Sequence, residues 1–238
     1  MIQIKSDKKI MSEIENILLR KRNFVSKIPE KAVFLFSGGF DSTAAIAYII
    51  ENWGTEIFPL FINRGQSNIE YEKEAVKHFE KILIERYPDK FNKVKEINVN
   101  IPAIEIKKDI PKKLQDIIGH PMRNPIMELY GVQYASTLDS VKTVLIASTP
   151  TDNYAHSQLA TLRSLTISAC MGMDDWNWQI TTPLKDPFLG KNISKKGLAD
   201  WAIKNNFNFD QTRSCIENSK TPCGKCVACK HRKEIYEL

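Results

Sequence analysis

Apolar residues along this chain follow two different periods, which alternate from one end of the sequence to the other. Short apolar runs between polar segments are typical of buried strands, and apolar residues three and four apart are typical of helices. The short runs predict strands over residues 32–36, 56–62, 94–99, 143–147 and 179–182. The helical spacing predicts helices over residues 11–28, 42–52, 70–87, 123–138, 157–171 and 194–204. Residues 100–120 follow neither period, because Pro102 and Pro111 interrupt them.

This alternation predicts an α/β fold in which helices cover both faces of a parallel sheet. We expect an N-terminal helical extension over residues 1–30 and one nucleotide-binding domain over residues 31–210. A cysteine-rich tail over residues 211–238 is expected to pack on that domain. Ligands bind beyond the carboxyl ends of parallel strands. The polar loops that follow the first, second and fourth strands are therefore expected on one rim of the sheet.

Composition indicates a globular protein but does not identify its ligand. Hydrophobic residues make up 42% and charged residues 26% of the 238 residues, as in ordinary globular proteins. The net charge of +6 suits a polyanionic ligand and a nucleic acid equally well. No apolar run is long enough to span a bilayer, and residues 1–9 lack the apolar core of a signal peptide. We therefore expect a cytoplasmic protein without a membrane partner.

The first predicted strand leads directly into Ser37-Gly38-Gly39-Phe40-Asp41-Ser42-Thr43 and then into an apolar helix. Glycines let a backbone turn tightly and approach an anion, and amides at a helix start point toward one spot. The hydroxyl groups of Ser37, Ser42 and Thr43 can add donors, and Asp41 is expected to cap the helix. The stretch therefore predicts a phosphate-binding loop. It lacks the lysine of a Walker A loop.

The Ser-Gly-Gly-x-Asp-Ser pattern resembles the signature of the PP-loop ATP pyrophosphatase family. The resemblance implies an adenine nucleotide alpha hydrolase-like fold and a loop that holds the β,γ-pyrophosphate of ATP. An acceptor then attacks the α-phosphate, and an adenylated intermediate forms. Mg²⁺ is expected from the chemistry of ATP rather than from any residue.

Four of the five cysteines lie close together in the tail, at Cys215, Cys223, Cys226 and Cys229. Four thiolates satisfy tetrahedral Zn²⁺ without an open position, which predicts a structural zinc site that orders the tail. An iron–sulfur cluster is the alternative, since Cys-x₂-Cys-x₂-Cys is also a cluster spacing. His231 would be a redundant ligand.

The fifth cysteine, Cys170, lies on an apolar helical stretch. Such a cysteine is more often a small buried hydrophobe than a nucleophile.

The phosphate loop and the cysteine tail together resemble the 7-cyano-7-deazaguanine synthase family over about residues 31–232. The resemblance implies ATP-dependent adenylation of 7-carboxy-7-deazaguanine, reaction with ammonia to an amide, and dehydration by a second ATP to a nitrile. It implies Asp41, Ser42 and Arg123 as catalytic candidates. The candidates for binding ATP are Ser37, Gly38, Gly39, Phe40, Asp41, Ser42, Thr43, Gln66 and Asp152. Arg64 is a further candidate cation.

The acceptor half of the chain departs from that family. The family has a Thr-Gly-x-x-x-x-Asp stretch after the fourth strand, followed by a substrate-binding segment, where this chain reads residues 148–157 as STPTDNYAHS. One alternative is therefore a paralogue that conjugates the activated acid to an amine of a protein or other macromolecule, as in antiviral defence. Exposed tryptophans at Trp176 and Trp178 would suit a protein partner, unless they belong to the core.

Two further alternatives stay open from the residues alone. One is a PP-loop tRNA sulfurtransferase, whose chemistry usually needs reactive cysteines. The other is a zinc module that binds nucleic acid through the basic tail without catalysis. Parallel α/β enzymes of this size often form homodimers, although no residue here identifies one.

Overall fold

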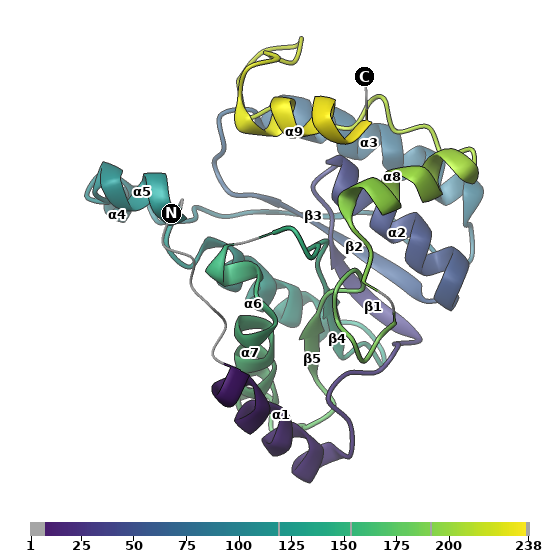
Figure 1. The fold of residues 1–238 in the computed structure, drawn as a ribbon, viewed down its shortest axis with the longest axis vertical. Helices are drawn as coiled ribbons and strands as arrows, with labels where there is room; N and C mark the ends of the chain where they lie inside the picture. Colours follow the sequence, from purple (N-terminus) through teal and green to yellow (C-terminus); the bar gives the residue numbers. More distant parts are fainter. Residues whose placement is uncertain (1–7, 119, 153, 191, 237–238) are drawn as a thin grey trace.

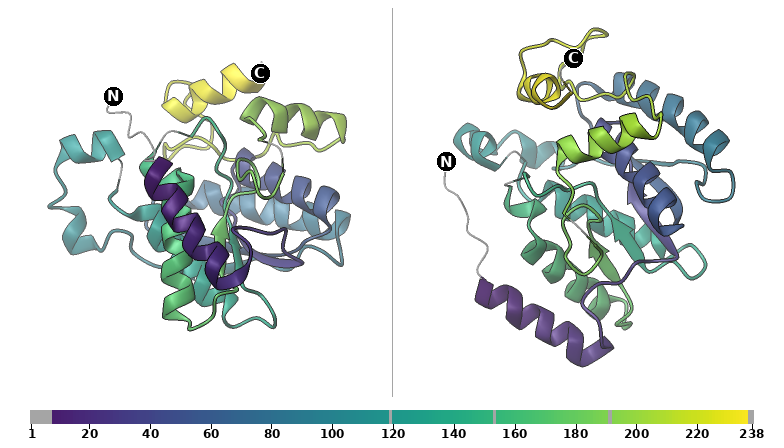
Figure 2. Two further views of the ribbon diagram at one scale, coloured as in Figure 1. Left: turned by 60° about the horizontal axis from the view of Figure 1, so that its bottom comes forward. Right: turned by 45° about the vertical axis from the view of Figure 1, so that its right-hand side comes forward.

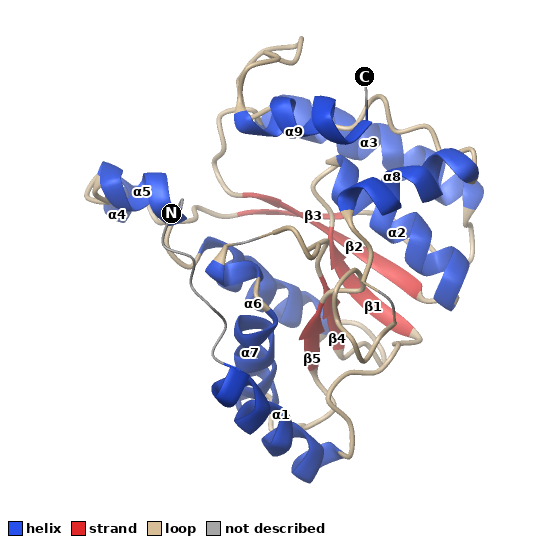
Figure 3. Ribbon diagram, in the orientation of Figure 1, coloured by secondary structure: helices blue, strands red, loops and turns tan. Residues whose placement is uncertain are grey.

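The computed structural model describes residues 8–118, 120–152, 154–190 and 192–236. Within these residues, strands form one parallel sheet in the order β3-β2-β1-β4-β5 (Figures 1 and 3). The strands are β1 (Lys31–Leu35), β2 (Glu56–Asn63), β3 (Lys95–Asn98), β4 (Thr143–Leu145) and β5 (Gln179–Thr181). The predicted α/β fold with a parallel sheet is confirmed.

Helices lie on both sides of the sheet, as Figure 1 shows. On one side are α2 (Phe40–Trp53), α3 (Ile69–Arg86), α8 (Lys195–Lys204) and α9 (Val227–Tyr236). On the other are α1 (Lys8–Arg22), α6 (Arg123–Ala135) and α7 (Leu159–Gly172). The short helices α4 (Ile104–Lys107) and α5 (Lys112–Ile118) stand to one side of the sheet (Figures 1 and 2), and a 3₁₀ turn, η1, covers Ala155–Ser157.

The strand order reverses between β1 and β4, because β2 and β3 extend the sheet in one direction and β4 and β5 in the other. Side chains alternate across β1: Phe34 packs into the core beneath α2, and Val33 packs into the core beneath α6 and α7. The point of reversal opens a crevice at the carboxyl ends of β1 and β4, where α/β sheets bind ligands.

Three predictions of local structure were incomplete. The first helix begins at Lys8 and ends at Arg22 rather than at residue 28, because Asn23 adopts a left-handed backbone with φ of 63°. Residues 100–120, predicted to be irregular, contain α4 and α5. The tail, predicted from its cysteines alone, also contains α9, which lies beside α8 in Figures 1 and 2.

The predicted N-terminal extension packs on the body of the molecule, since α1 contacts α7. Arg163 of α7 is fully buried, and its guanidinium donates to Asp186 at 2.8 Å and to the hydroxyl of Ser26 at 2.7 Å. Glu15 of α1 lies 3.5 Å from the same guanidinium. The predicted division of the chain into three parts stays a prediction, and its residues 1–7 and 237–238 lie outside the described residues.

Among the described residues, none of the helices combines the length and the apolar character needed to cross a bilayer.

Candidate active site

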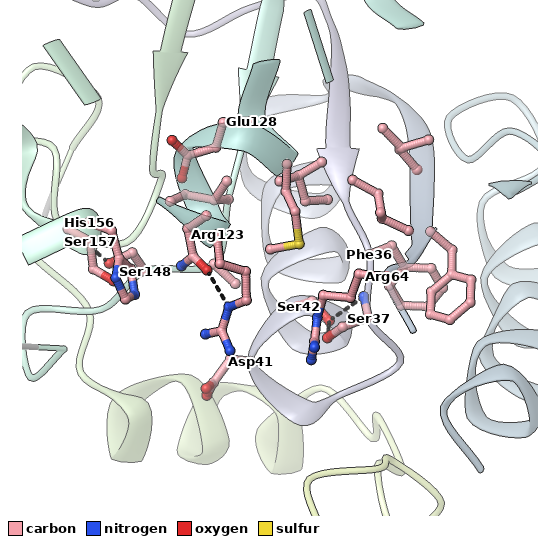
Figure 4. A pocket seen from close by; sticks show the side chains of 18 of the residues that line it. Phe36, Ser37, Asp41, Ser42, Arg64, Arg123, Glu128, Ser148, His156 and Ser157 are labelled. Carbon is pink, nitrogen blue, oxygen red and sulfur yellow. Dashed lines mark hydrogen bonds between the residues drawn. The ribbon is translucent and has the colours of Figure 1, made fainter. Parts of the chain in front are cut away.

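A cavity of about 410 Å³ lies at the point where the strand order reverses. Its walls come from the ends of β1, β2 and β4, from the first turns of α2 and α6, and from the loop that precedes α7 (Figure 4). The ionisable side chains that line it are Asp41, Arg64, Glu72, Arg123, Glu128, Asp152, Tyr154 and His156. The floor is apolar and is formed by Leu35, Leu60, Ile62, Met127 and Ile146.

The predicted phosphate loop forms the mouth of this cavity. Its hydroxyl groups hold the loop closed: Ser42 Oγ lies 3.2 Å from Ser37 Oγ and donates to the carbonyl oxygen of Gly39 at 3.0 Å. Helix α2 begins at Phe40 with Gly39 as N-cap, and the N-cap residue makes no side-chain capping hydrogen bond. The predicted capping role of Asp41 is therefore wrong. The start of α2 is left to face the cavity, as anion binding requires.

The glycines of the loop are required by close packing. Gly38 has φ of +69°, and a Cβ added to it would lie 2.9 Å from the backbone nitrogen of Val76 in α3. The carbonyl oxygen of Gly38 accepts a hydrogen bond from the backbone nitrogen of Arg213 at 2.9 Å. The loop is thus held from two sides, by α3 and by the segment that leads to the cysteines.

Two predicted ATP-binding residues keep their side chains out of the cavity. Phe40 is 2% exposed, and its ring packs edge-on against Phe209 at 4.5 Å. Thr43 is fully buried and donates its hydroxyl hydrogen to the carbonyl oxygen of Gly39 at 2.8 Å. These two side chains support the loop from behind.

Asp41 faces a lysine that was not identified from the sequence. Nζ of Lys195, the first residue of α8, lies 3.1 Å from Asp41 and 3.1 Å from Asp152. Burial raises the pKa of Asp41, although Lys195 opposes the shift. Asp152 also accepts hydrogen bonds from the backbone nitrogen (2.7 Å) and hydroxyl (3.0 Å) of Thr149. Two predicted residues, Asp41 and Asp152, are thus brought together around one ammonium group.

Arg64 and Arg123 both face the cavity. Burial lowers the pKa of each guanidinium; repulsion from Arg64 further lowers the pKa of Arg123, whereas Glu72 opposes the shift of Arg64. Among the described residues, no carboxylate lies within 4.0 Å of either guanidinium; Arg123 Nε donates only to the side-chain oxygen of Asn124, at 3.1 Å. Two half-buried cations without a carboxylate partner among the described residues favour an anionic ligand between them.

Gln66 follows β2, lines the cavity, and is held by its neighbours. Its side-chain oxygen accepts from the backbone nitrogen of Arg64 at 2.9 Å, and its amide nitrogen donates to Glu72 at 2.5 Å. Gln66 therefore fixes the loop that presents Arg64, in addition to lining the cavity itself.

The loop after β4 supplies a neutral histidine. Burial lowers the pKa of His156 to about 4, so its imidazole is uncharged at neutral pH. Its ring stacks on Tyr154 with an interplanar angle of 4°. The pair offers a flat surface beside the cavity, and no motif in the sequence indicated it.

Glu128 is a further residue that the sequence analysis missed. It lies on α6, is fully buried, and neither carboxylate oxygen has a hydrogen-bond partner. Burial raises the pKa of its carboxyl to about 8. Its helical neighbours Gly131, Val132 and Ala135 are also buried. A glutamate on the otherwise apolar face of this helix is the sequence signal that could have identified it.

The four tail cysteines converge as predicted. The Sγ atoms of Cys215, Cys223, Cys226 and Cys229 all lie within 4.8 Å of one another. Three of these sulfur atoms accept backbone N–H hydrogen bonds at 3.3–3.4 Å. The set fits a tetrahedral metal ion with thiolate ligands. The carbonyl oxygen of Cys215 accepts from Asn68 at 3.0 Å, which ties the cluster to the start of α3.

Cys170, Trp176 and Trp178 lie outside both the cavity and the cysteine cluster. Cys170 is buried and donates to the carbonyl oxygen of Trp178 at 3.3 Å. Trp178 is 4% exposed and belongs to the core, so the expected tryptophan-rich surface does not include it. None of the described cysteines lines the cavity.

Comparison with known proteins agrees with this arrangement. Residues 31–238 match the family model described as queuosine biosynthesis protein QueC. The chain is 27% identical over 221 residues to the 7-cyano-7-deazaguanine synthase of Acetivibrio thermocellus, which covers 87% of this chain and 93% of that protein. It is 26% identical over 220 residues to the synthase of Thermoplasma volcanium, covering 86% of each.

Among solved structures, a 4-thiouridine synthetase–RNA complex with bound ATP aligns with a TM-score of 0.52 at 16% identity. The alignment covers 87% of this chain and 50% of that chain, and the likeness concerns the fold alone.

Proposed function

Because the chain belongs to the family of the queuosine biosynthesis protein QueC and is an ATP-dependent enzyme of the PP-loop type, we propose that it adenylates 7-carboxy-7-deazaguanine. The observation that carries the proposal is the convergence on one cavity of a glycine loop, an open helix start and two arginines for which the described residues provide no carboxylate partner within 4.0 Å. Such a set of fixed donors and cations suits the tail of a nucleoside triphosphate.

The proposed roles follow from charge. The backbone of Ser37 to Ser42 and the start of α2 would hold the β,γ-pyrophosphate, with Lys195 at the same mouth. A carboxylate oxygen of the acid attacks the α-phosphorus, the bond to the bridging oxygen breaks, and pyrophosphate leaves with its negative charge. Fixed donors accelerate this step because they stabilise charge that develops on the leaving group. Arg123 and Arg64 would contact the α-phosphate of ATP and the carboxylate of the acid. Mg²⁺ bound with ATP would neutralise phosphate oxygens.

Later steps need no further protein nucleophile. Ammonia attacks the acyl carbon, AMP leaves, and an amide results. The amide oxygen then attacks the α-phosphorus of a second ATP and pyrophosphate leaves. AMP departs with that oxygen, the amide nitrogen gives up its two protons, and the nitrile forms. The tail cysteines would hold Zn²⁺ as a structural ion, because four converging thiolates leave no open position for catalysis.

The experiment is incubation of the metal-loaded protein with ATP, Mg²⁺, ammonia and 7-carboxy-7-deazaguanine. We expect AMP and pyrophosphate that appear only when the acid is present, and a nitrile product in the mass spectrum. ADP as the nucleotide product, or no turnover of ATP with this acid, would contradict the proposal. An amide without nitrile would retain the adenylation and remove the dehydration step. Attachment of the acid to a macromolecule would retain the adenylation and replace ammonia as the acceptor.

Two other functions have less support. Sulfur transfer to tRNA would need a reactive cysteine, whereas Cys170 is buried and none of the described cysteines lines the cavity. A nucleic-acid module without catalysis leaves the phosphate loop unexplained. Conjugation to a macromolecule remains the alternative acceptor chemistry that the product analysis above distinguishes.

A further inference from the structure

The carboxyl group of Glu128 is a buried polar group without a hydrogen-bond partner among the described residues. The residue is fully buried, lines the candidate active site, and both of its oxygens lack a hydrogen-bond partner. Removing a carboxylate from water is costly unless hydrogen bonds or a cation replace the water. Since α6 presents this group at the cavity, its missing partner is expected to come from a ligand.

The neighbouring cations have other positions. Arg123 begins the same helix, and Figure 4 shows its guanidinium between Glu128 and Asp41, with its hydrogen bond directed to Asn124. Among the described residues, no Lys, Arg or His nitrogen lies within 4.0 Å of the Glu128 oxygens. Glu128 therefore is not part of a structural ion pair within the described fold.

The surroundings of the carboxylate indicate the kind of ligand. Met127 and Ile146 line the same cavity and give it apolar walls, which suit a flat ring. A carboxylate is an acceptor through both oxygens and pairs best with two adjacent N–H donors in one plane. A 2-amino-4-oxopyrimidine ring offers this pair, through its ring N–H and its exocyclic amino group.

We propose that Glu128 is a specificity-determining residue that accepts these two N–H donors from the heterocycle of the acid. The inference rests on the proposed function, because the acid proposed there carries a 2-amino-4-oxopyrimidine edge. In this arrangement the ring lies against the apolar floor, with its carboxylate toward Arg123 and the phosphate loop.

The adenine ring of ATP is a poorer partner for Glu128. Its edge offers an amino donor beside a ring nitrogen that is an acceptor, and that nitrogen would face a carboxylate oxygen without a hydrogen between them. Figure 4 also shows Glu128 on the side of the cavity opposite Asp41 and the phosphate loop. Both the hydrogen-bond pattern of adenine and the position of Glu128 therefore favour recognition of the heterocycle of the acid by Glu128 rather than recognition of ATP.

The pairing predicts a proton that leaves on binding. In the empty cavity, burial raises the pKa of Glu128 to about 8, so the carboxyl is mostly protonated at pH 7. Two N–H donors require the ionised form, and the ligand therefore lowers this pKa when it binds. Nearly one proton should be released to the buffer at pH 7 for each molecule bound.

The test compares wild-type protein with the Glu128→Gln variant, which keeps the shape but replaces one acceptor oxygen by a donor. The probes are 7-carboxy-7-deazaguanine and its analogue without the 2-amino group, in titration calorimetry with buffers of different ionisation enthalpy. We expect wild-type protein to prefer the amino compound by about 10-fold or more. The variant should lose this preference and the proton release, and its KM for the acid should rise while its KM for ATP stays within a factor of about two.

The Glu74→Gln variant is the control. Glu74 lies on α3, is exposed and does not line the cavity. Its preference for the 2-amino compound and its proton release should match those of wild-type protein. An unchanged preference in Glu128→Gln would overturn the inference. A lower kcat with an unchanged KM for the acid would also overturn it, because that result indicates a catalytic base instead.

Failure of the proposed function is distinguishable from failure of this inference. If the acid does not bind to wild-type protein, the same measurement is made with 7-deazaguanine and 7-deazahypoxanthine. Binding of 7-deazaguanine alone, abolished by Glu128→Gln, would retain the role of Glu128 and remove only the carboxylate substrate. If neither base binds, the inference falls together with the substrate.

Discussion

Nζ of Lys195 lies 3.1 Å from a carboxylate oxygen of Asp41, and this contact joins the first turn of α8 to the first turn of α2. A cation at the first position of a helix is opposed by the helix dipole. Ser194 nevertheless caps α8 by accepting from the backbone nitrogen of Gly197, and this cap fixes Lys195 at the start of the helix. Asp41 and Asp152 together compensate the positive charge of Lys195, and they hold its ammonium group at the mouth of the phosphate loop.

The Lys195→Ala variant should lose most of its activity. Without the ammonium, Asp41 and Asp152 repel each other, and the mouth of the loop turns from mixed to negative charge. We expect pyrophosphate release to fall about 10²- to 10³-fold, the range found when one charge-stabilising donor is removed. Lys196→Ala is the matched control, because Lys196 is exposed and, within the described part of the chain, the one carboxylate within 4.0 Å of it belongs to Asp200, at 3.9 Å. Equal activity of the two variants would contradict a role for Lys195 at the phosphates.

The sequence was sufficient for the parts of the site that depend on local pattern. The apolar run before Ser37 predicted β1, and the glycines after it predicted the loop, because both signals lie within a few residues. Gln66 and Asp152 were placed on the same rim because the carboxyl ends of parallel strands meet there. Ser37, Gln66 and Asp152 all line one cavity.

Lys195 and Glu128 were not predictable by the same reasoning. The role of Lys195 depends on how α8 packs against α2, and this contact between distant segments has no periodic signature. Glu128 was hidden because a glutamate in a helix is ordinarily a solvent-facing residue. Helix α9 was missed for a third reason, since its apolar residues are few and the cysteines dominate the pattern.

The Gly38→Ala variant should bind ATP poorly and unfold more readily. Its φ of +69° strains any residue with a Cβ, and the added carbon would lie 2.9 Å from the backbone nitrogen of Val76. The Gly54→Ala variant separates the two effects, because Gly54 has φ of +67° but no atom within 4 Å of the added carbon. Gly54→Ala should cost about 1–2 kcal/mol from strain alone. We expect the midpoint of urea unfolding to fall further in Gly38→Ala, with loss of ATP binding only in that variant.

Removal of the metal should weaken ATP binding as well as stability. The segment before the cluster donates from the Arg213 backbone to Gly38, and Asn68 holds the Cys215 carbonyl oxygen. Release of the metal frees the thiols and should loosen this segment, and with it the phosphate loop. We expect the Cys226→Ser variant to lose bound metal, to melt at a lower temperature and to show a raised KM for ATP.

The control for this prediction is Cys170→Ala, which removes a thiol outside the cluster. It should retain one equivalent of metal by elemental analysis. The same analysis identifies the ion: iron, together with visible absorption, would indicate an iron–sulfur cluster instead of zinc. An unchanged KM for ATP in metal-free Cys226→Ser would show that the cluster and the loop are independent.

The stability of the unliganded protein should depend on the protonation of Glu128. Burial raises the pKa of this carboxyl from 4.5 in the unfolded chain to about 8 in the folded protein. The folded state therefore binds more protons than the unfolded state between these values, and the free energy of unfolding falls as pH rises through this range. Each pKa unit corresponds to about 1.4 kcal/mol, so the destabilisation reaches a few kcal/mol at pH 8 and above.

The Glu128→Gln variant should remove this dependence. It should be more stable than wild-type protein at pH 8, and the difference should shrink as pH falls toward 5, because Glu128 is then protonated in the folded protein and increasingly protonated in the unfolded chain. His156 has the opposite influence below pH 6.5, since burial lowers its pKa to about 4, but this effect is common to both proteins and cancels in the difference. Urea unfolding at several pH values measures it, with the exposed Glu74→Gln as the control. A difference between wild-type and Glu128→Gln that stays constant from pH 5 to 8 would mean that Glu128 is already ionised in the folded protein.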